Sequence, residues 1–219
     1  MKVGIVRFPG SNCDFDMYYA IKDTLGFNVN FIWHKSTQVS GYDYIILPGG
    51  FSFGDYLRCG AIARFSPVMK AVIDFAQKGG RLLGICNGFQ ILCEAGLLPG
   101  ALIRNIKMRF ICNVQALKVE NSSVSFNQKN IQSIVHLPVA HGEGNYYIDD
   151  EGLKNLQANN QILLRYEDNP NGSLSNIAGI RNKEGTIFGM MPHPERAVDK
   201  IHPNQSGIGV LKALLTYNE

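Results

Sequence analysis

The chain has 219 residues, of which 45% are hydrophobic and 18% charged, and its formal net charge is +3. This apolar content excludes a disordered chain, and so small a charge excess gives no indication of nucleic acid or a membrane surface as a partner. No signal peptide is recognisable, and no window approaches the roughly 18 uninterrupted apolar residues of a membrane span. We therefore expect a globular protein with a single domain over residues 1–219.

The cysteines indicate the compartment. There are five, an odd number, and no two have C-x-x-C spacing. This pattern is unlike a disulfide framework or a zinc ribbon, and the histidines and cysteines show no metal-ligand spacing. We expect reduced thiols, a cytoplasmic location and no bound metal.

In the first half of the chain, short apolar runs alternate with helical patterns. The expected strands are 2–8, 28–34, 42–47 and 81–85, and the expected helices are 14–25, 67–78 and 87–95. Strands separated by helices predict βαβ units. We expect a flavodoxin-like α/β fold, with an open, mostly parallel sheet flanked by helices.

The second half differs, because its expected strands are linked by turn clusters rather than helices. These strands are 115–120, 134–139, 162–166, 178–181 and 186–190, and a closing helix is expected over 208–217. We interpret the strands as antiparallel additions to one side of the sheet.

The most informative segment is Gly84-Ile85-Cys86-Asn87-Gly88, which stands between an expected strand and an expected helix. It has the G-x-nucleophile-x-G form of a nucleophile elbow. A cysteine at a helix N-terminus is stabilised as a thiolate, and the N–H of Asn87 is placed to stabilise an oxyanion. The alternative is a buried cysteine between two structural glycines.

Two further segments also follow expected strands. Pro192-His193-Pro194-Glu195 offers a base and an orienting carboxylate, although the same pattern fits a proline-rich surface turn. Gly49-Gly50 permits close approach of backbone to a ligand and a second oxyanion donor, although it also fits an ordinary turn. In open α/β sheets, sites form at the carboxyl ends of the strands, where all three segments lie.

Gly84-Ile85-Cys86-Asn87-Gly88-Phe89-Gln90 together with Pro192-His193-Pro194-Glu195 resembles the triad (class I) glutamine amidotransferases. Four other blocks resemble one branch of that family, the glutaminase subunits of phosphoribosylformylglycinamidine synthases in de novo purine synthesis. The blocks are Phe8 to Asp14, Pro48 to Arg58, Ala140 to Gly144 and Asn169 to Ser173.

The resemblance implies roles for individual residues. Cys86 corresponds to the nucleophile, His193 to the base and Glu195 to the acid that orients it. The implied oxyanion and substrate-binding residues are Gly49, Gly50, Asn87, Gln90, His141, Gly142 and Glu143.

The resemblance also implies partners. Such a subunit hydrolyses glutamine through a cysteine thioester and passes ammonia to a large synthetase subunit, which acts with a small accessory subunit. The synthetase uses ATP and Mg²⁺ to convert formylglycinamide ribonucleotide to formylglycinamidine ribonucleotide. This chain has no G-x-x-x-x-G-K-[ST] phosphate loop, so we expect no cofactor in it.

Three alternatives remain open at this point. A cysteine hydrolase or stress protein of the peptidase-like superfamily has a similar elbow, but it usually carries histidine where Asn87 stands. A non-catalytic scaffold is a second alternative, which the intact triad disfavours. A third is another amidotransferase that serves a different synthetase.

Overall fold

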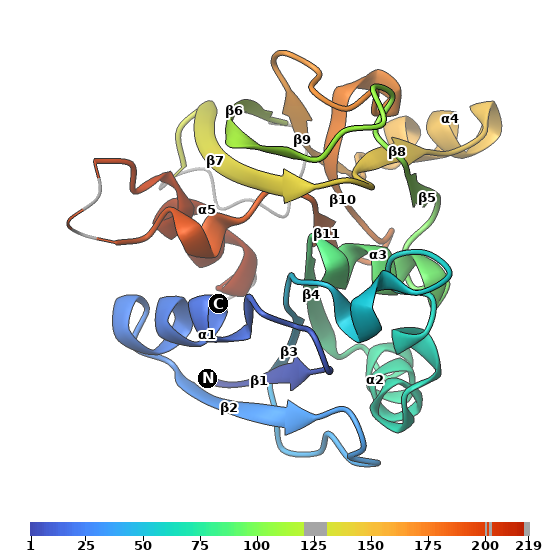
Figure 1. Ribbon diagram of the computed structural model, residues 1–219. Coiled ribbons are helices and arrows are strands. Elements are labelled where there is room, and N and C mark those ends of the chain that lie inside the picture. The colour runs from blue at the N-terminus through green and yellow to red at the C-terminus, as the bar shows by residue number, and fades with distance from the viewer. Residues whose placement is uncertain (121–130, 200, 202, 217–219) are drawn as a thin grey trace.

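A computed structural model describes residues 1–120, 131–199, 201 and 203–216. Its centre is a nine-stranded sheet in the order β2-β1-β3-β4-β11-β10-β9-β6-β7 (Figure 1). Five neighbouring strands are parallel: β1 (Lys2–Arg7), β2 (Asn28–Trp33), β3 (Tyr44–Leu47), β4 (Arg81–Ile85) and β11 (Ile187–Met190). The predicted mostly parallel α/β sheet is therefore confirmed.

Helices cover both faces of the parallel strands. Figure 1 shows α1 (Asp14–Tyr19) and α5 (Ser206–Leu215) on one side, and α2 (Pro67–Gln77) and α3 (Asn87–Glu94) on the other. The helix predicted over 14–25 is α1 continued by a π-helical turn, Ala20–Thr24. The helix predicted over 208–217 begins earlier, and residue 217 lies outside the described residues.

Four strands of the second half are antiparallel additions, as predicted. They are β6 (Ile111–Val119), β7 (Ile134–His141), β9 (Ile162–Tyr166) and β10 (Ile177–Arg181). The prediction was wrong for β11, which pairs parallel with β4 and antiparallel with β10. All four β11 residues are buried, as in a parallel strand covered on both faces.

Among the described residues, two strands and one α-helix have no counterpart in the sequence prediction. A separate two-stranded sheet joins β5 (Ala101–Ile103) to β8 (Asn145–Tyr147). Helix α4 (Asp150–Ala158) is capped by Asp149, whose carboxylate accepts a hydrogen bond of 2.7 Å from the backbone N–H of Gly152.

No helix in the described part of the chain is long and apolar enough to cross a membrane.

Candidate active site

Cys86 lies at the corner where β4 ends and α3 begins. Its backbone has φ 49° and ψ −105°, a strained conformation for a residue with a side chain. A β-carbon on Gly88 would lie 1.9 Å from the carbonyl oxygen of Leu47, and one on Gly84 would lie 2.6 Å from the carbonyl oxygen of Gly88. The two glycines are therefore required by close packing, and the predicted elbow is present.

The elbow is held from two sides. The backbone N–H of Cys86 donates to the carbonyl of Met190 at the end of β11, at 2.7 Å. Cys86 Sγ lies 3.7 Å from the carbonyl oxygen of Ala140 in β7, and the residue is buried. The nucleophile candidate thus sits between the parallel and the antiparallel parts of the sheet.

His193 and Glu195 follow β11 and form a buried pair. His193 Nδ1 and Glu195 Oε1 are 2.6 Å apart, and the two side chains are 1% and 0% exposed. The N–H of His193 donates to the carbonyl of Pro138 at 2.8 Å, which fixes the backbone. The segment is therefore not a solvated surface turn.

The charges around His193 favour its protonated form. Burial alone lowers the pKa of His193. The Glu195 carboxylate and the Cys86 sulfur raise this pKa by more than burial lowers it, so the net shift is upward. His193 Nε2 is buried and has no hydrogen-bond partner among the described residues. One ring nitrogen is thus bound to Glu195, while the other remains available to a reacting group.

The glycine loop after β3 packs directly on this pair. A β-carbon on Gly49 would lie 2.6 Å from His193 Cε1. Gly50 has φ +130°, and a β-carbon there would lie 2.6 Å from the backbone nitrogen of Asn12. The backbone of this loop can therefore approach the site only because both residues are glycine.

Side-chain amides connect the glycine loop, the elbow and the turn at residues 141–144. Asn87 Oδ1 accepts from the backbone N–H of Ser52 at 3.2 Å, and Asn87 Nδ2 donates to Gln90 Oε1 at 3.0 Å. Gln90 Nε2 in turn donates to the carbonyl of Glu143 at 2.6 Å. The structure thus brings together Asn87, Gln90 and Glu143.

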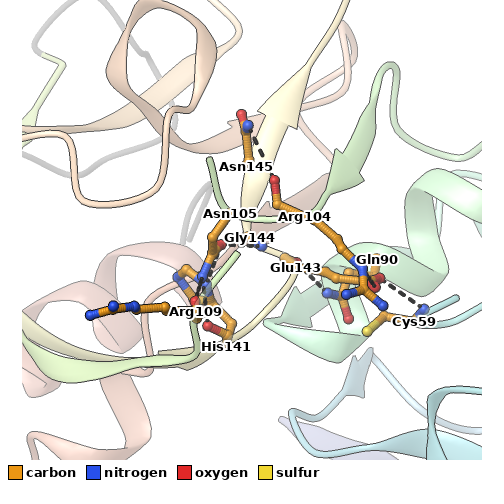
Figure 2. Close-up of polar contacts among 9 residues, drawn as sticks. All are labelled: Cys59, Gln90, Arg104, Asn105, Arg109, His141, Glu143, Gly144 and Asn145. Carbon is orange, nitrogen blue, oxygen red and sulfur yellow. Dashed lines mark hydrogen bonds and ion pairs between the residues drawn. The ribbon is translucent and has the colours of Figure 1, made fainter. Parts of the chain in front are cut away.

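Asn105 holds the turn from the other side, as Figure 2 shows. Its Nδ2 donates to the carbonyls of Arg109 and His141, at 2.8 and 2.9 Å. Its Oδ1 accepts from the N–H of Gly144 at 3.0 Å and lies 3.1 Å from His141 Nδ1. Asn105 was not predicted as a site residue, because it lies in none of the sequence motifs described above.

These contacts fix the state of His141. Because backbone carbonyls only accept, the Asn105 amide has one orientation, and its oxygen must receive a proton from His141 Nδ1. Burial, followed by the charge of His193, lowers the pKa of His141 to about 4. His141 is therefore a neutral residue that supports the turn, with Nε2 left as an acceptor.

A cavity of about 340 Å³ lies between the 51–59 segment, the 104–110 segment and the turn. Carboxylates and guanidinium groups line it together, namely Asp55, Glu143, Arg104 and Arg109. Glu143 is 3.6 Å from Arg104 and also accepts from the backbone N–H of Cys59 at 3.3 Å. Burial, together with the charge of Glu143, raises the pKa of Asp55. The cavity suits a small ligand that carries both charges.

Cys13 is another residue that the sequence did not connect with the site. Its sulfur lies within 4.8 Å of ligand atoms of His193 and Glu195, and Arg196 Nη2 approaches it to 3.1 Å. Burial, and then the Glu195 charge, raise the pKa of the Cys13 thiol to about 12. Because about 180 positions separate these residues in the chain, no local pattern could have indicated their contact.

A cysteine elbow on a parallel sheet, with a buried His–Glu pair after the neighbouring strand, defines the class of triad glutamine amidotransferases. The CobB/CobQ-like glutamine amidotransferase domain model matches residues 1–208, and the chain belongs to this family. The chain is therefore a glutamine amidotransferase, and the peptidase-like alternative is not supported.

Solved structures agree with this assignment. A chain in the structure of PurLQS from Thermotoga maritima is 40% identical, covers 100% of this chain and is itself covered to 99%, with a TM-score of 0.88. A glutamine amidotransferase from Thermotoga maritima is 14% identical, with coverages of 98% and 96% and a TM-score of 0.67. The glutaminase domain of Trypanosoma brucei CTPS is 13% identical, with coverages of 100% and 95% and a TM-score of 0.64. The last two show the fold alone.

Proposed function

We propose that this chain is the glutaminase subunit of a phosphoribosylformylglycinamidine synthase in de novo purine synthesis. The observation that carries the proposal is its 40% identity, over essentially the full length of both chains, to a chain of PurLQS. The sequence blocks at residues 8–14, 48–58 and 169–173, which lie outside the elbow, support the same branch.

In the proposed reaction, Cys86 Sγ attacks the side-chain amide carbon of glutamine. The backbone N–H groups of Asn87 and Gly50 stabilise the oxyanion, and the strained backbone of Cys86 supports this arrangement. The carbon–nitrogen bond then breaks, and the proton on His193 Nε2 goes to the departing ammonia. Water, deprotonated by His193, cleaves the thioester and releases glutamate.

Glu195 orients His193 and stabilises its protonated form through the contact of 2.6 Å. The charged cavity provides the groups that the amino-acid portion of glutamine requires. We assign its ammonium group to Asp55 and Glu143 and its carboxylate to Arg104 and Arg109. Gly142 lines this cavity, and Gln90 is hydrogen-bonded to the backbone of Glu143, which also lines it. We assign Gly49 and His141 to the surroundings of the substrate as well.

Ammonia is useful to a synthesis only if a partner receives it before it is protonated in bulk water. We propose that the partner is a large synthetase subunit that binds ATP and Mg²⁺ and acts with a small accessory subunit, all in the cytoplasm. Exposed apolar side chains beside the cavity support contact with a partner. They are Tyr56, Leu57, Ile106, Met108 and Phe110, which are 73%, 89%, 70%, 67% and 54% exposed.

The test is a reconstituted complex that contains the Cys86→Ala variant. Synthesis of formylglycinamidine ribonucleotide from glutamine should be abolished, while synthesis from added ammonium chloride should keep the wild-type rate. Loss of both activities would show that Cys86 supports the assembly rather than glutamine hydrolysis. A wild-type chain that does not stimulate synthesis from glutamine would contradict the proposed partner.

A further inference from the structure

A group of three possible metal ligands lies behind the His193–Glu195 pair. Cys13 Sγ, one ring nitrogen of His193 and one carboxylate oxygen of Glu195 lie within 4.8 Å of one another, and all three residues are buried. Cys13 directly precedes α1, whereas the other two follow β11. The fold therefore joins sulfur, nitrogen and oxygen donors from the two ends of the chain.

The donor set is one that Zn²⁺ prefers, since thiolate, imidazole and carboxylate are its ordinary protein ligands. Zinc–ligand bonds of about 2.0–2.3 Å place neighbouring donors of a tetrahedral site roughly 3.3–3.7 Å apart. His193 Nδ1 and Glu195 Oε1 are only 2.6 Å apart, so zinc between them takes the place of the shared proton and separates the two atoms by about 1 Å. Glu195 Oε2 is buried and has no hydrogen-bond partner among the described residues. One donor is thus already unoccupied.

A second cavity lies beside this group on the side of α1, although neither Cys13 nor His193 lines it and the Glu195 side chain is 0% exposed. Its volume is about 810 Å³, and Glu195 and Arg196 form part of its wall. Three more carboxylates line it and favour the entry of a cation, namely Asp16, Asp23 and Asp199. This cavity shares no lining residue with the charged cavity assigned to glutamine.

Two nearby positive charges oppose a cation. Arg196 Nη2 lies 3.1 Å from Cys13 Sγ, and His193, whose protonated form is favoured, must lose a proton when it binds the metal. The same guanidinium already pairs through Nε with Asp16 at 3.0 Å. Arg196 can therefore release the sulfur and keep a carboxylate partner. Its Coulomb repulsion of a metal ion falls as the distance between the guanidinium and the ion increases.

We propose that Cys13, His193 and Glu195 form an inhibitory site for Zn²⁺, which enters through the cavity beside α1. Bound zinc withdraws His193 and Glu195 from the reaction without occupying the glutamine cavity. The inhibition rests on the proposed roles of His193 and Glu195, whereas binding of zinc does not. The two can therefore be tested separately.

Binding is measured on the full chain carrying Cys86→Ala, so that the sulfur of the elbow cannot be a ligand. Competition for Zn²⁺ with a chromophoric chelator should give one zinc per chain. Adding Cys13→Ser should weaken the affinity at least about 100-fold, more than loss of an outer-shell contact does. Adding Cys112→Ser, which changes an exposed cysteine, should leave the affinity unchanged. Equal affinity with Cys13→Ser, or no binding in the Cys86→Ala chain, would overturn the site.

Inhibition is measured on glutamine hydrolysis by the chain assembled with its partners, with each variant compared with its own zinc-free rate. Zinc should lower kcat without raising the KM for glutamine, and Cys13→Ser should raise the half-inhibitory concentration at least tenfold. Inhibition that competes with glutamine and is unchanged by Cys13→Ser would place the zinc on Cys86 and overturn the proposal. Zinc that binds through Cys13 without lowering the rate would overturn the inhibitory role.

Discussion

Gly49 lies against the imidazole ring of His193, so closely that a β-carbon at position 49 would come within 2.6 Å of His193 Cε1. The glycine loop therefore restricts the position of the His193 ring, in addition to the oxyanion-donor role proposed for it. Gly49 borders the imidazole on the side of Cε1 and Nδ1, because the same β-carbon would lie 3.3 Å from His193 Nδ1, the atom that contacts Glu195.

Gly49→Ala is expected to displace the imidazole and to lower kcat for glutamine hydrolysis about 100-fold, the usual effect of a misplacement near 1 Å. Steady-state kinetics with the partner subunits present measures this. The matched control is Gly96→Ala, at a position where a β-carbon would meet nothing within 4 Å. Alanine at position 96 is expected to lower the stability of the fold, because the backbone there has a positive φ, but it should leave kcat unchanged. An unaltered kcat in Gly49→Ala would contradict the placement of His193.

Glu195→Gln keeps the shape of the side chain but removes its charge. Because the Glu195 carboxylate stabilises the protonated form of His193, kcat should fall about 10³-fold while KM changes little. Glu184→Gln, on an exposed turn, is the control for removing one acidic group. A loss of less than tenfold would show that Glu195 is a structural residue.

Asn105→Asp replaces the donor Nδ2 with an oxygen that faces two carbonyls. We expect a loss of roughly 2–4 kcal/mol in the free energy of unfolding and a raised KM for glutamine, because the turn at residues 141–144 is released. Denaturant unfolding and glutamine kinetics measure the two effects. Asn113→Asp, on the exposed part of β6, should change neither. A stable variant with normal KM would refute the supporting role of Asn105.

The neutral His141 gives stability a defined pH dependence. Its pKa is about 4 in the folded chain and about 6.5 when unfolded, so between these values the unfolded state binds more protons. The contribution of His141 to the free energy of unfolding is fully present above about pH 6.5. It falls by about 3 kcal/mol as the pH drops to 4. His141→Gln should remove this part of the acid slope in denaturant unfolding followed against pH. An identical slope in both proteins would contradict a buried neutral His141.

Local patterns predicted the parts of the site that lie within a few residues of one another. The elbow could be recognised because Gly84, Cys86 and Gly88 constrain the same turn, and His193 could be paired with Glu195 because two positions separate them. The parallel strands could be predicted because helical patterns separate them. The resemblance to known amidotransferases then supplied the residues of the turn at 141–144.

The remaining features depend on contacts that the sequence does not encode locally. The direction of β11 is fixed by its pairing with β4, not by its own residues. Helix α4 was not predicted because most of its residues are polar and Leu156 is the only one of them that is buried. Cys13 and Asn105 acquire their positions only when distant segments pack around His193 and His141.

The central claim is that Cys86, and not the nearby Cys13, is the nucleophile. The most direct test is alkylation of the assembled protein with diazo-oxo-norleucine, a glutamine analogue, followed by intact mass and peptide mapping with glutamine as competitor. We predict a single adduct on Cys86 that glutamine prevents. An adduct on Cys13, or no adduct with the partner subunits present, would contradict the account.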